Sequence, residues 1–172
     1  MLKVIGAAMV VLAGGIAGMQ LAKYYARRPR ELKSMMGALL LLKTEIGYAA
    51  TPLPEALTVI AKRADPAVSH FFHTAAAYLH NVPGATAVEA WSRALAEAGR
   101  TMALREEDVE TLQDLGASLG GSCREEQVRH IALAIERLKA SAASAETDAG
   151  RYVRLYNFLG FGAGLTVVIL LC

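Results

Sequence analysis

The chain has 172 residues, of which 54% are hydrophobic and 20% charged, with 18 lysines and arginines against 16 aspartates and glutamates. This composition excludes an intrinsically disordered chain and a collagen-like repeat. Two cysteines, Cys123 and Cys172, are too few to build a disulfide framework or a zinc site.

The N-terminal segment is an apolar run over residues 4–22, whose only polar side chain is Gln20. A bilayer core requires about 20 apolar residues, so we predict a transmembrane helix there, after an extracytoplasmic N-terminus of residues 1–3. Gly14 and Gly18 lie four residues apart, a spacing that lets another span pack closely. A buried core helix or a cleaved signal peptide is the alternative interpretation of this run.

The charges around this run favour a retained span over a signal peptide. Only Lys3 precedes it, whereas four basic residues follow closely: Lys23, Arg27, Arg28 and Arg30. Basic residues are retained on the cytoplasmic side of a membrane. We therefore place the N-terminus outside and the chain after residue 22 in the cytoplasm.

Residues 23–152 are predicted to form an all-α cytoplasmic domain, because apolar residues recur every three or four positions and no segment alternates as a strand would. Thr86 with Glu89 and Ser122 with Glu125 have the spacing of capping boxes at helix starts. Asp65 followed by Pro66 is a further helix start. We expect six helices. Three have both bounds, at residues 31–48, 67–80 and 105–119, and one begins at 124. Another opens after the chain break at residues 51–54 and includes residues 57–61, and one is capped by Thr86 and ended by Gly99.

The last of these helices is expected to continue into a second transmembrane helix over residues 153–172. Arg151 and Arg154 precede the apolar part of this span and no charge follows it, which places the C-terminus outside as well. Gly160 and Gly164 repeat the close-packing spacing of the first span. A kink or break at Gly150 is the alternative to one continuous helix.

The charge is distributed unevenly between the membrane flanks and the domain. All acidic residues lie within residues 31–150, which hold 11 basic and 16 acidic residues and so a net charge of −5. The basic footprint expected of a nucleic-acid-binding domain is therefore absent, and no nucleic-acid partner is predicted. The basic flanks are explained by orientation and by anionic lipid.

Catalytic and cofactor motifs are sparse in this sequence. His70, His73 and His80 could share a helix face and hold a metal, which would suit a small membrane hydrolase. No carboxylate or cysteine stands beside them at ligand spacing, so surface or packing histidines are the simpler interpretation. We predict no enzyme, no cofactor and no metal site.

One acidic run could receive a basic partner. It comprises Glu106, Glu107, Asp108, Glu110 and Asp114, at the start of a predicted helix. The alternative is a solvated face that compensates the helix dipole.

Several segments taken together resemble the stage III sporulation protein AB family. They are Arg28 to Leu32, residues 42–48 leading to 51–57, the region of Trp91, residues 115–120 with Ser122, Glu125 and Gln127, and the closing residues 152–171. Cys123 departs from the family pattern, in which an acidic residue is expected after the capping Ser122.

This resemblance implies a sporulation protein in the mother-cell membrane that faces the engulfed forespore. It implies a cytoplasmic domain similar to the inner-membrane platform protein of type II secretion and type IV pilus machines. The implied partners are a secretion-type ATPase, stage III sporulation protein AA, and the other channel subunits of the same operon. A homo-oligomer is compatible with this assembly, and a membrane tether or signalling module without an ATPase is the alternative function.

Overall fold

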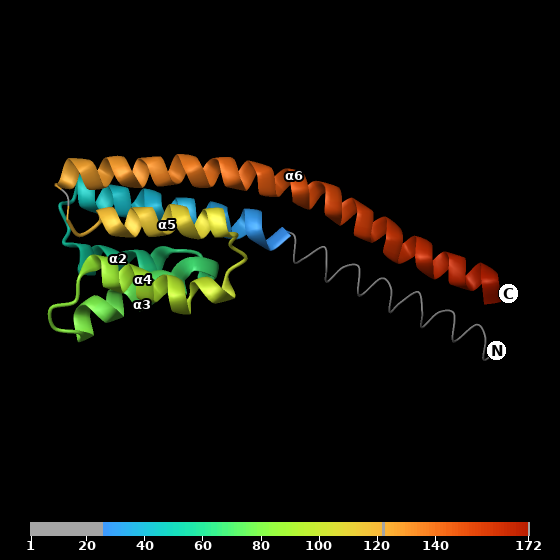
Figure 1. The fold of residues 1–172 in the computed structure, drawn as a ribbon, viewed down its shortest axis with the longest axis horizontal. Coiled ribbons are helices and arrows are strands. Elements are labelled where there is room, and N and C mark those ends of the chain that lie inside the picture. The colour runs from blue at the N-terminus through green and yellow to red at the C-terminus, as the bar shows by residue number, and fades with distance from the viewer. Residues whose placement is uncertain (1–25, 122, 172) are drawn as a thin grey trace. The chain divides into compact units, whose positions relative to one another are not determined.

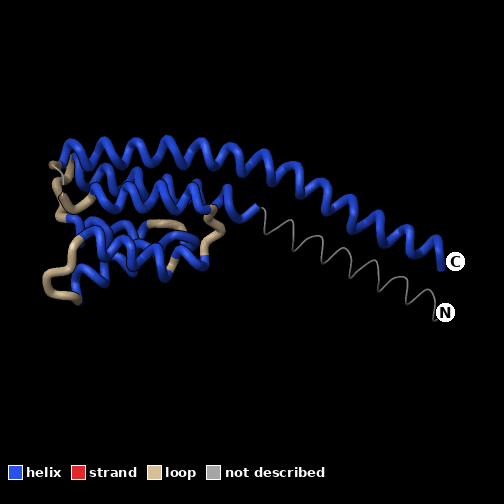
Figure 2. The backbone as a smooth tube through the Cα atoms, in the orientation of Figure 1, coloured by secondary structure: helices blue, strands red, loops and turns tan. Residues whose placement is uncertain are grey.

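The structure is a computed structural model that describes residues 26–121 and 123–171, with the backbone alone described for residues 152–171. This part of the chain contains six α-helices, one short 3-10 helix and no strand (Figure 2). The prediction of an all-α fold is confirmed. The helices cover residues 26–47 (helix 26–47), Leu53–Arg63 (α2), Pro66–Asn81 (α3), Ala87–Glu97 (α4), Glu106–Ser118 (α5) and Arg124–Leu171 (α6), with the 3-10 helix at Gly99–Thr101 (η1).

Helix starts follow the capping signals of the sequence. The Asp65 carboxylate accepts a hydrogen bond from the backbone N–H of Ala67 at 2.9 Å, and Pro66 occupies the first turn of α3, where its missing N–H costs nothing. Thr86 and Glu89 form the predicted reciprocal capping box of α4. Ser122, the other predicted cap, lies outside the described residues.

Two predictions about helix boundaries are changed by the structure. The first described helix does not begin at Glu31, because residues 26–30, with Pro29 among them, are already helical. The predicted start followed the first apolar residue of the periodic pattern, whereas arginines are good helix formers and carry the helix further upstream. Helix α6 continues through Gly150 as one element of 48 residues, which excludes a break there.

Residues 30–142 form one compact unit, and the described residues 26–29 and 143–171 belong to another. In the first unit, helix 26–47, α5 and the beginning of α6 form one layer, and α2, α3 and α4 form the second (Figure 1). Helices α2, α3 and α4 pack in sequence order, and α4 also contacts α5. A Cβ atom on Gly47 would lie 3.2 Å from a Val128 methyl carbon, so helix 26–47 and α6 are in close contact.

An aromatic cluster joins the two layers. Phe71, Phe72 and Trp91 are fully buried and meet edge to face, with the Phe71 and Trp91 ring centroids 4.8 Å apart. The Trp91 indole N–H donates to the backbone carbonyl of Leu112 on α5 at 2.7 Å. Gly116 lies directly beneath the same indole, because a Cβ atom there would be 2.3 Å from Trp91 Cδ1.

The membrane predictions fall largely on residues that the structure does not describe. The span over residues 4–22, with Gly14, Gly18 and the flanking Lys23, lies outside the described residues. Gly160 and Gly164 belong to the α6 backbone, and Cys172 lies outside the described residues. Within the part of the chain that was searched, no helix has both the length and the apolar character needed to cross a membrane.

The basic residues assigned to membrane orientation have different environments. Arg28 is buried, whereas Arg27, Arg30 and Arg151 are exposed. Arg30 lies 3.8 Å from the Asp65 carboxylate, an exposed pair that contributes little to stability. Only the backbone of Arg154 is described.

Candidate functional site

The acidic run identified in the sequence forms the exposed side of α5. Glu106, Glu110 and Asp114 follow one another at intervals of four residues, so they occupy successive turns on one side of the helix. All three are exposed. Glu106 and Glu110 have no hydrogen-bond or ion-pair partner within the described ranges, and carboxylates in the first turn interact favourably with the helix dipole.

Asp108 does not belong to this exposed side, and its assignment to a partner surface is wrong. The residue is fully buried, and its carboxylate accepts a hydrogen bond from the backbone N–H of Arg105 at 2.9 Å. Its position is in register with the buried Leu112 and Leu115 of the same helix and with the buried Leu119 that caps it. The spacing of four residues to Leu112 was the sequence signal for burial.

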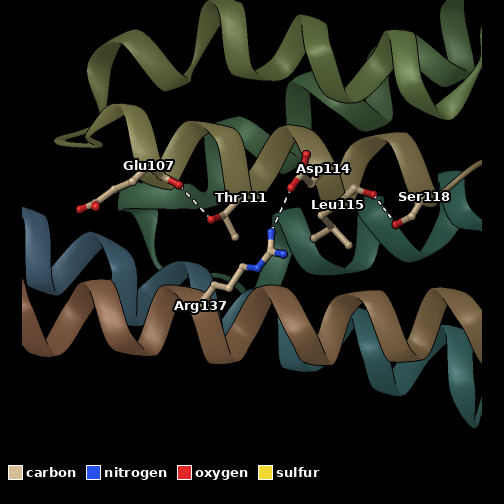
Figure 3. A network of polar contacts seen from close by, with 6 residues as sticks. All are labelled: Glu107, Thr111, Asp114, Leu115, Ser118 and Arg137. Atoms are coloured by element: carbon tan, nitrogen blue, oxygen red, sulfur yellow. Dashed lines mark hydrogen bonds and ion pairs between the residues drawn. The ribbon is translucent and has the colours of Figure 1, made fainter.

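Glu107 lies beside Asp108 but remains exposed. Its backbone carbonyl accepts a hydrogen bond from the Thr111 hydroxyl at 2.9 Å, which leaves the carboxylate at the surface (Figure 3). The exposed acidic face therefore comprises Glu106, Glu107, Glu110 and Asp114. We call these four residues the acidic face.

One member of the acidic face connects α5 to α6. The Arg137 guanidinium of α6 lies 3.0 Å from the Asp114 carboxylate of α5 (Figure 3). The two side chains are 60% and 70% exposed, so solvent screens the pair and its net contribution to stability is at most about 1 kcal/mol. The pair can thus open at small cost.

A groove of about 320 Å³ lies between α5 and α6 at this ion pair, and we call it the α5–α6 groove. Helix α5 contributes Thr111, Asp114, Leu115 and Ala117. Helix α6 contributes His130, Leu133, Ala134 and Arg137. Leu133, one of several large apolar side chains exposed in the described residues, is 52% exposed.

Sequence reasoning did not identify Leu133 as part of a surface. Apolar residues recur at helical spacing along α6 at Val128, Ile131, Ile135 and Leu138, and Leu133 falls outside this stripe. The signal in the sequence was an apolar residue that lies outside the apolar stripe of an amphipathic helix.

The three histidines are exposed and are only partly brought together. His73 and His80 line a groove between α2 and α3 that also includes Thr58 and Lys62, and His70 is not among its lining residues. The Thr58 hydroxyl donates its hydrogen to the Pro54 carbonyl at 2.9 Å, so it accepts from His80 Nε2 at 3.3 Å. Across the described residues, no group of three or more His, Cys, Asp or Glu side chains could hold a metal ion.

A further groove, whose lining includes Glu125 as well as two basic residues, lies where helix 26–47 ends beside the start of α6. It is lined by Lys43, Tyr48, Arg124 and Val128, among others, and the Tyr48 side chain is 89% exposed. Ala50, just beyond, has a φ of 55°, a backbone region that residues other than glycine seldom adopt. The sequence predicted the chain break here but not the groove.

Comparisons with known proteins all identify the same family. The Stage III sporulation protein AB family matches residues 3–172. Stage III sporulation protein AB of Bacillus subtilis (strain 168) is 36% identical over 171 residues, which cover 99% of each chain. A solved structure of a stage III sporulation protein AB superposes with a TM-score of 0.67 at 35% identity, covering 72% of this chain and 97% of that one.

Proposed function

This chain belongs to the stage III sporulation protein AB family, and a role in stage III of sporulation follows from that membership; we propose that within it the chain is a non-enzymatic platform subunit. In this proposal the helical domain binds a cytoplasmic secretion-type ATPase, stage III sporulation protein AA. The subunit couples that ATPase to the conduit between mother cell and forespore, which other channel subunits of the operon build. The resemblance stated above supplies the identity of these partners.

The observation that carries the proposal is the acidic face of α5 and its connection to α6. Glu106 and Glu110 are exposed on a helix whose other side is fixed in the core, so the face is rigidly presented. Asp114 contacts Arg137 of α6, and the Leu119 carbonyl at the end of α5 accepts from the Gln127 side chain at 2.9 Å. The Gln127 contact, more than the weak exposed pair of Asp114 with Arg137, would pass a force on α5 to α6, a single helix of 48 residues.

We further propose that residues 4–22 and 153–172 span the mother-cell membrane around the forespore, with both termini outside and the helical domain in the cytoplasm. The charge asymmetry at both apolar segments supports this topology. Gly14 with Gly18 and Gly160 with Gly164 would let the spans pack against each other, against other subunits or against a second copy. Protease added outside intact cells should leave residues 31–150 uncut, and cleavage there would contradict the topology.

Charge reversal of the acidic face tests the coupling role. The full-length chain carrying Glu106→Lys and Glu110→Lys should capture at least tenfold less ATPase than the unaltered chain, because two exposed carboxylates become repulsive to a basic partner. Affinity should be measured by titrating the purified ATPase against the immobilised, detergent-solubilised chain.

The matched control reverses two exposed carboxylates elsewhere, Glu55→Lys on α2 and Glu97→Lys on α4, with the same change in net charge. This variant should bind as the unaltered chain does. If both variants lost ATPase binding equally, the effect would come from net charge alone, and α5 would not be the partner surface. If the unaltered chain does not bind the ATPase, the tether or signalling alternative is favoured.

A further inference from the structure

Helix α5, which carries the acidic face, is attached at each end to a different neighbouring helix. We infer that Glu31, a buried carboxylate of helix 26–47, is the positioning residue for the start of α5 and thereby holds the acidic face ready for binding. The attachment itself stands on the structure alone, whereas its effect on ATPase binding rests on the proposed function.

Glu31 contacts a part of the chain that is distant in sequence. The residue is 5% exposed, and its Oε2 atom accepts a hydrogen bond from the backbone N–H of Ala103, 72 positions further along the chain. Ala103 lies between η1 and α5, where the chain has no regular secondary structure. A backbone N–H in such a segment has no helical partner, so its acceptor must come from elsewhere. Glu31 supplies that acceptor and fixes the chain just before α5 begins.

A second buried carboxylate acts two residues later in the same segment. Asp108 accepts from the backbone N–H of Arg105 at 2.9 Å, within the first turn of α5 itself. This contact is local, so it determines how the chain enters the helix but not where the helix lies in the domain. The contact of Glu31 joins two separate helical regions and therefore does determine that position.

The other end of α5 is held from α6. The Gln127 side-chain amide donates to the Leu119 carbonyl at 2.9 Å. The three helices lie in one layer (Figure 1), and both contacts belong to the compact unit of residues 30–142. In the proposed topology, helix 26–47 and α6 are the two helices that lead to the membrane spans. Helix α5 is thus held at its start by one of them and at its end by the other.

The charge of Glu31 determines the strength of its contact. A hydrogen bond from an amide to a carboxylate is about twice as strong as one between neutral groups. An amide in place of the carboxylate would therefore weaken the contact with little change in shape. If the segment before α5 moved freely, a partner that binds Glu106 and Glu110 would have to order it on binding, at a cost in affinity. Glu31 removes that cost in advance.

Glu45, on the same helix, offers a matched control. Its carboxylate accepts from the Thr51 hydroxyl at 2.9 Å and lies 4.0 Å from the Arg63 guanidinium. Glu45 therefore connects helix 26–47 to the region of α2 and not to α5. Glu45→Gln removes the same charge from the same helix and leaves the Ala103 contact in place.

The test measures amide hydrogen exchange and ATPase binding on the purified full-length chain and on the two glutamine variants. In Glu31→Gln, the amide of Ala103 should exchange about tenfold faster, because its hydrogen bond is weaker. The ATPase should bind this variant about threefold to tenfold more weakly. In Glu45→Gln, both quantities should match those of the unaltered chain.

A third variant removes the donor of the hydrogen bond instead of the acceptor. Ala103→Pro has no N–H at this position, and Met102 already has φ −89° and ψ 150°, the extended conformation that a residue before proline adopts. This variant should weaken ATPase binding as Glu31→Gln does. If Ala103→Pro bound the ATPase normally while Glu31→Gln did not, Glu31 would act through its charge and not through this contact, which overturns the inference.

The remaining outcomes separate this inference from the proposed function. Unchanged exchange at Ala103 in Glu31→Gln overturns the attachment. Faster exchange with unchanged ATPase affinity overturns the positioning role and leaves the ATPase as partner. Equal loss of binding in Glu45→Gln would mean that any carboxylate of helix 26–47 has this effect, which also overturns the positioning role. Failure of the unaltered chain to bind the ATPase overturns the proposed function, while the exchange result still decides the attachment.

Discussion

The two sides of helix α5 are under different structural constraints. On the inner side, Asp108, Leu112, Leu115 and Gly116 are buried, and Gly116 leaves no space for even one added carbon against Trp91. On the outer side, Glu106 and Glu110 contact solvent and have no side-chain partner among the residues described. The inner side is fixed by packing, and the outer side is exposed to solvent.

This contrast separates residues needed for stability from residues available for function within a single helix. A substitution on the inner side should change the free energy of unfolding, and one on the outer side should change binding alone. The predictions below test that separation, beginning with the largest expected effect.

Gly116→Ala should lower the free energy of unfolding by about 3 kcal/mol, because the added carbon would collide with the buried and hydrogen-bonded Trp91 ring. The same substitution at Gly37, on helix 26–47, meets no neighbouring atom. There it should raise stability by about 0.5–1 kcal/mol, the usual advantage of alanine over glycine in a helix. Denaturant unfolding of both variants measures the two changes in the free energy of unfolding. If both changes had the same sign, packing against Trp91 would not distinguish Gly116 from Gly37.

Asp108→Ala should cost about 2 kcal/mol, because it removes the buried carboxylate that accepts from the Arg105 backbone N–H and leaves that donor without its acceptor. Glu106→Ala, two residues away on the outer side, should change stability by less than about 0.5 kcal/mol. Thermal unfolding of the two variants measures both changes in stability. Equal costs would mean that charge near the helix start, rather than burial, determines the contribution of these carboxylates.

The smallest expected effect concerns Glu89, whose carboxylate is exposed but held in place by hydrogen bonding. The backbone N–H of Thr86, with a further contribution from the Thr86 hydroxyl, holds the pKa of Glu89 below its ordinary value. A lowered pKa in the folded state stabilises the fold above the ordinary pKa and ceases to do so as the pH falls through the lowered value.

Glu89→Gln should therefore lose less stability than the unaltered chain between about pH 5 and about pH 3, where carboxylates titrate. Unfolding temperatures measured across this range give the comparison. Thr86→Ala removes the hydroxyl but keeps the backbone N–H, which is the larger cause of the lowered pKa of Glu89, so it should flatten the profile less than Glu89→Gln does. A profile unchanged in both variants would show that the capping box has no role in acid stability.

The sequence was sufficient for the fold class, the six helices and most of the buried faces, because apolar periodicity and capping residues are local signals. It did not predict that Asp108 is buried. The acidic side chain suggested exposure, although its position is in register with Leu112 and Leu115. The α5–α6 groove could not be predicted, because it depends on which helices become neighbours. Helix periodicity shows which side of a helix is buried but does not identify the element that covers it.

The contact of Gly47 with Val128 has a consequence for the order of folding. These residues are about 80 positions apart, whereas α2, α3 and α4 each pack on the next helix along the chain. Local pairs close short loops and form first, and distant pairs carry the larger entropic cost. During synthesis, the end of helix 26–47 at Gly47 must therefore remain without its α6 neighbour until the last third of the chain leaves the ribosome. The nascent chain is thus most prone to aggregation in the interval just before α6 emerges.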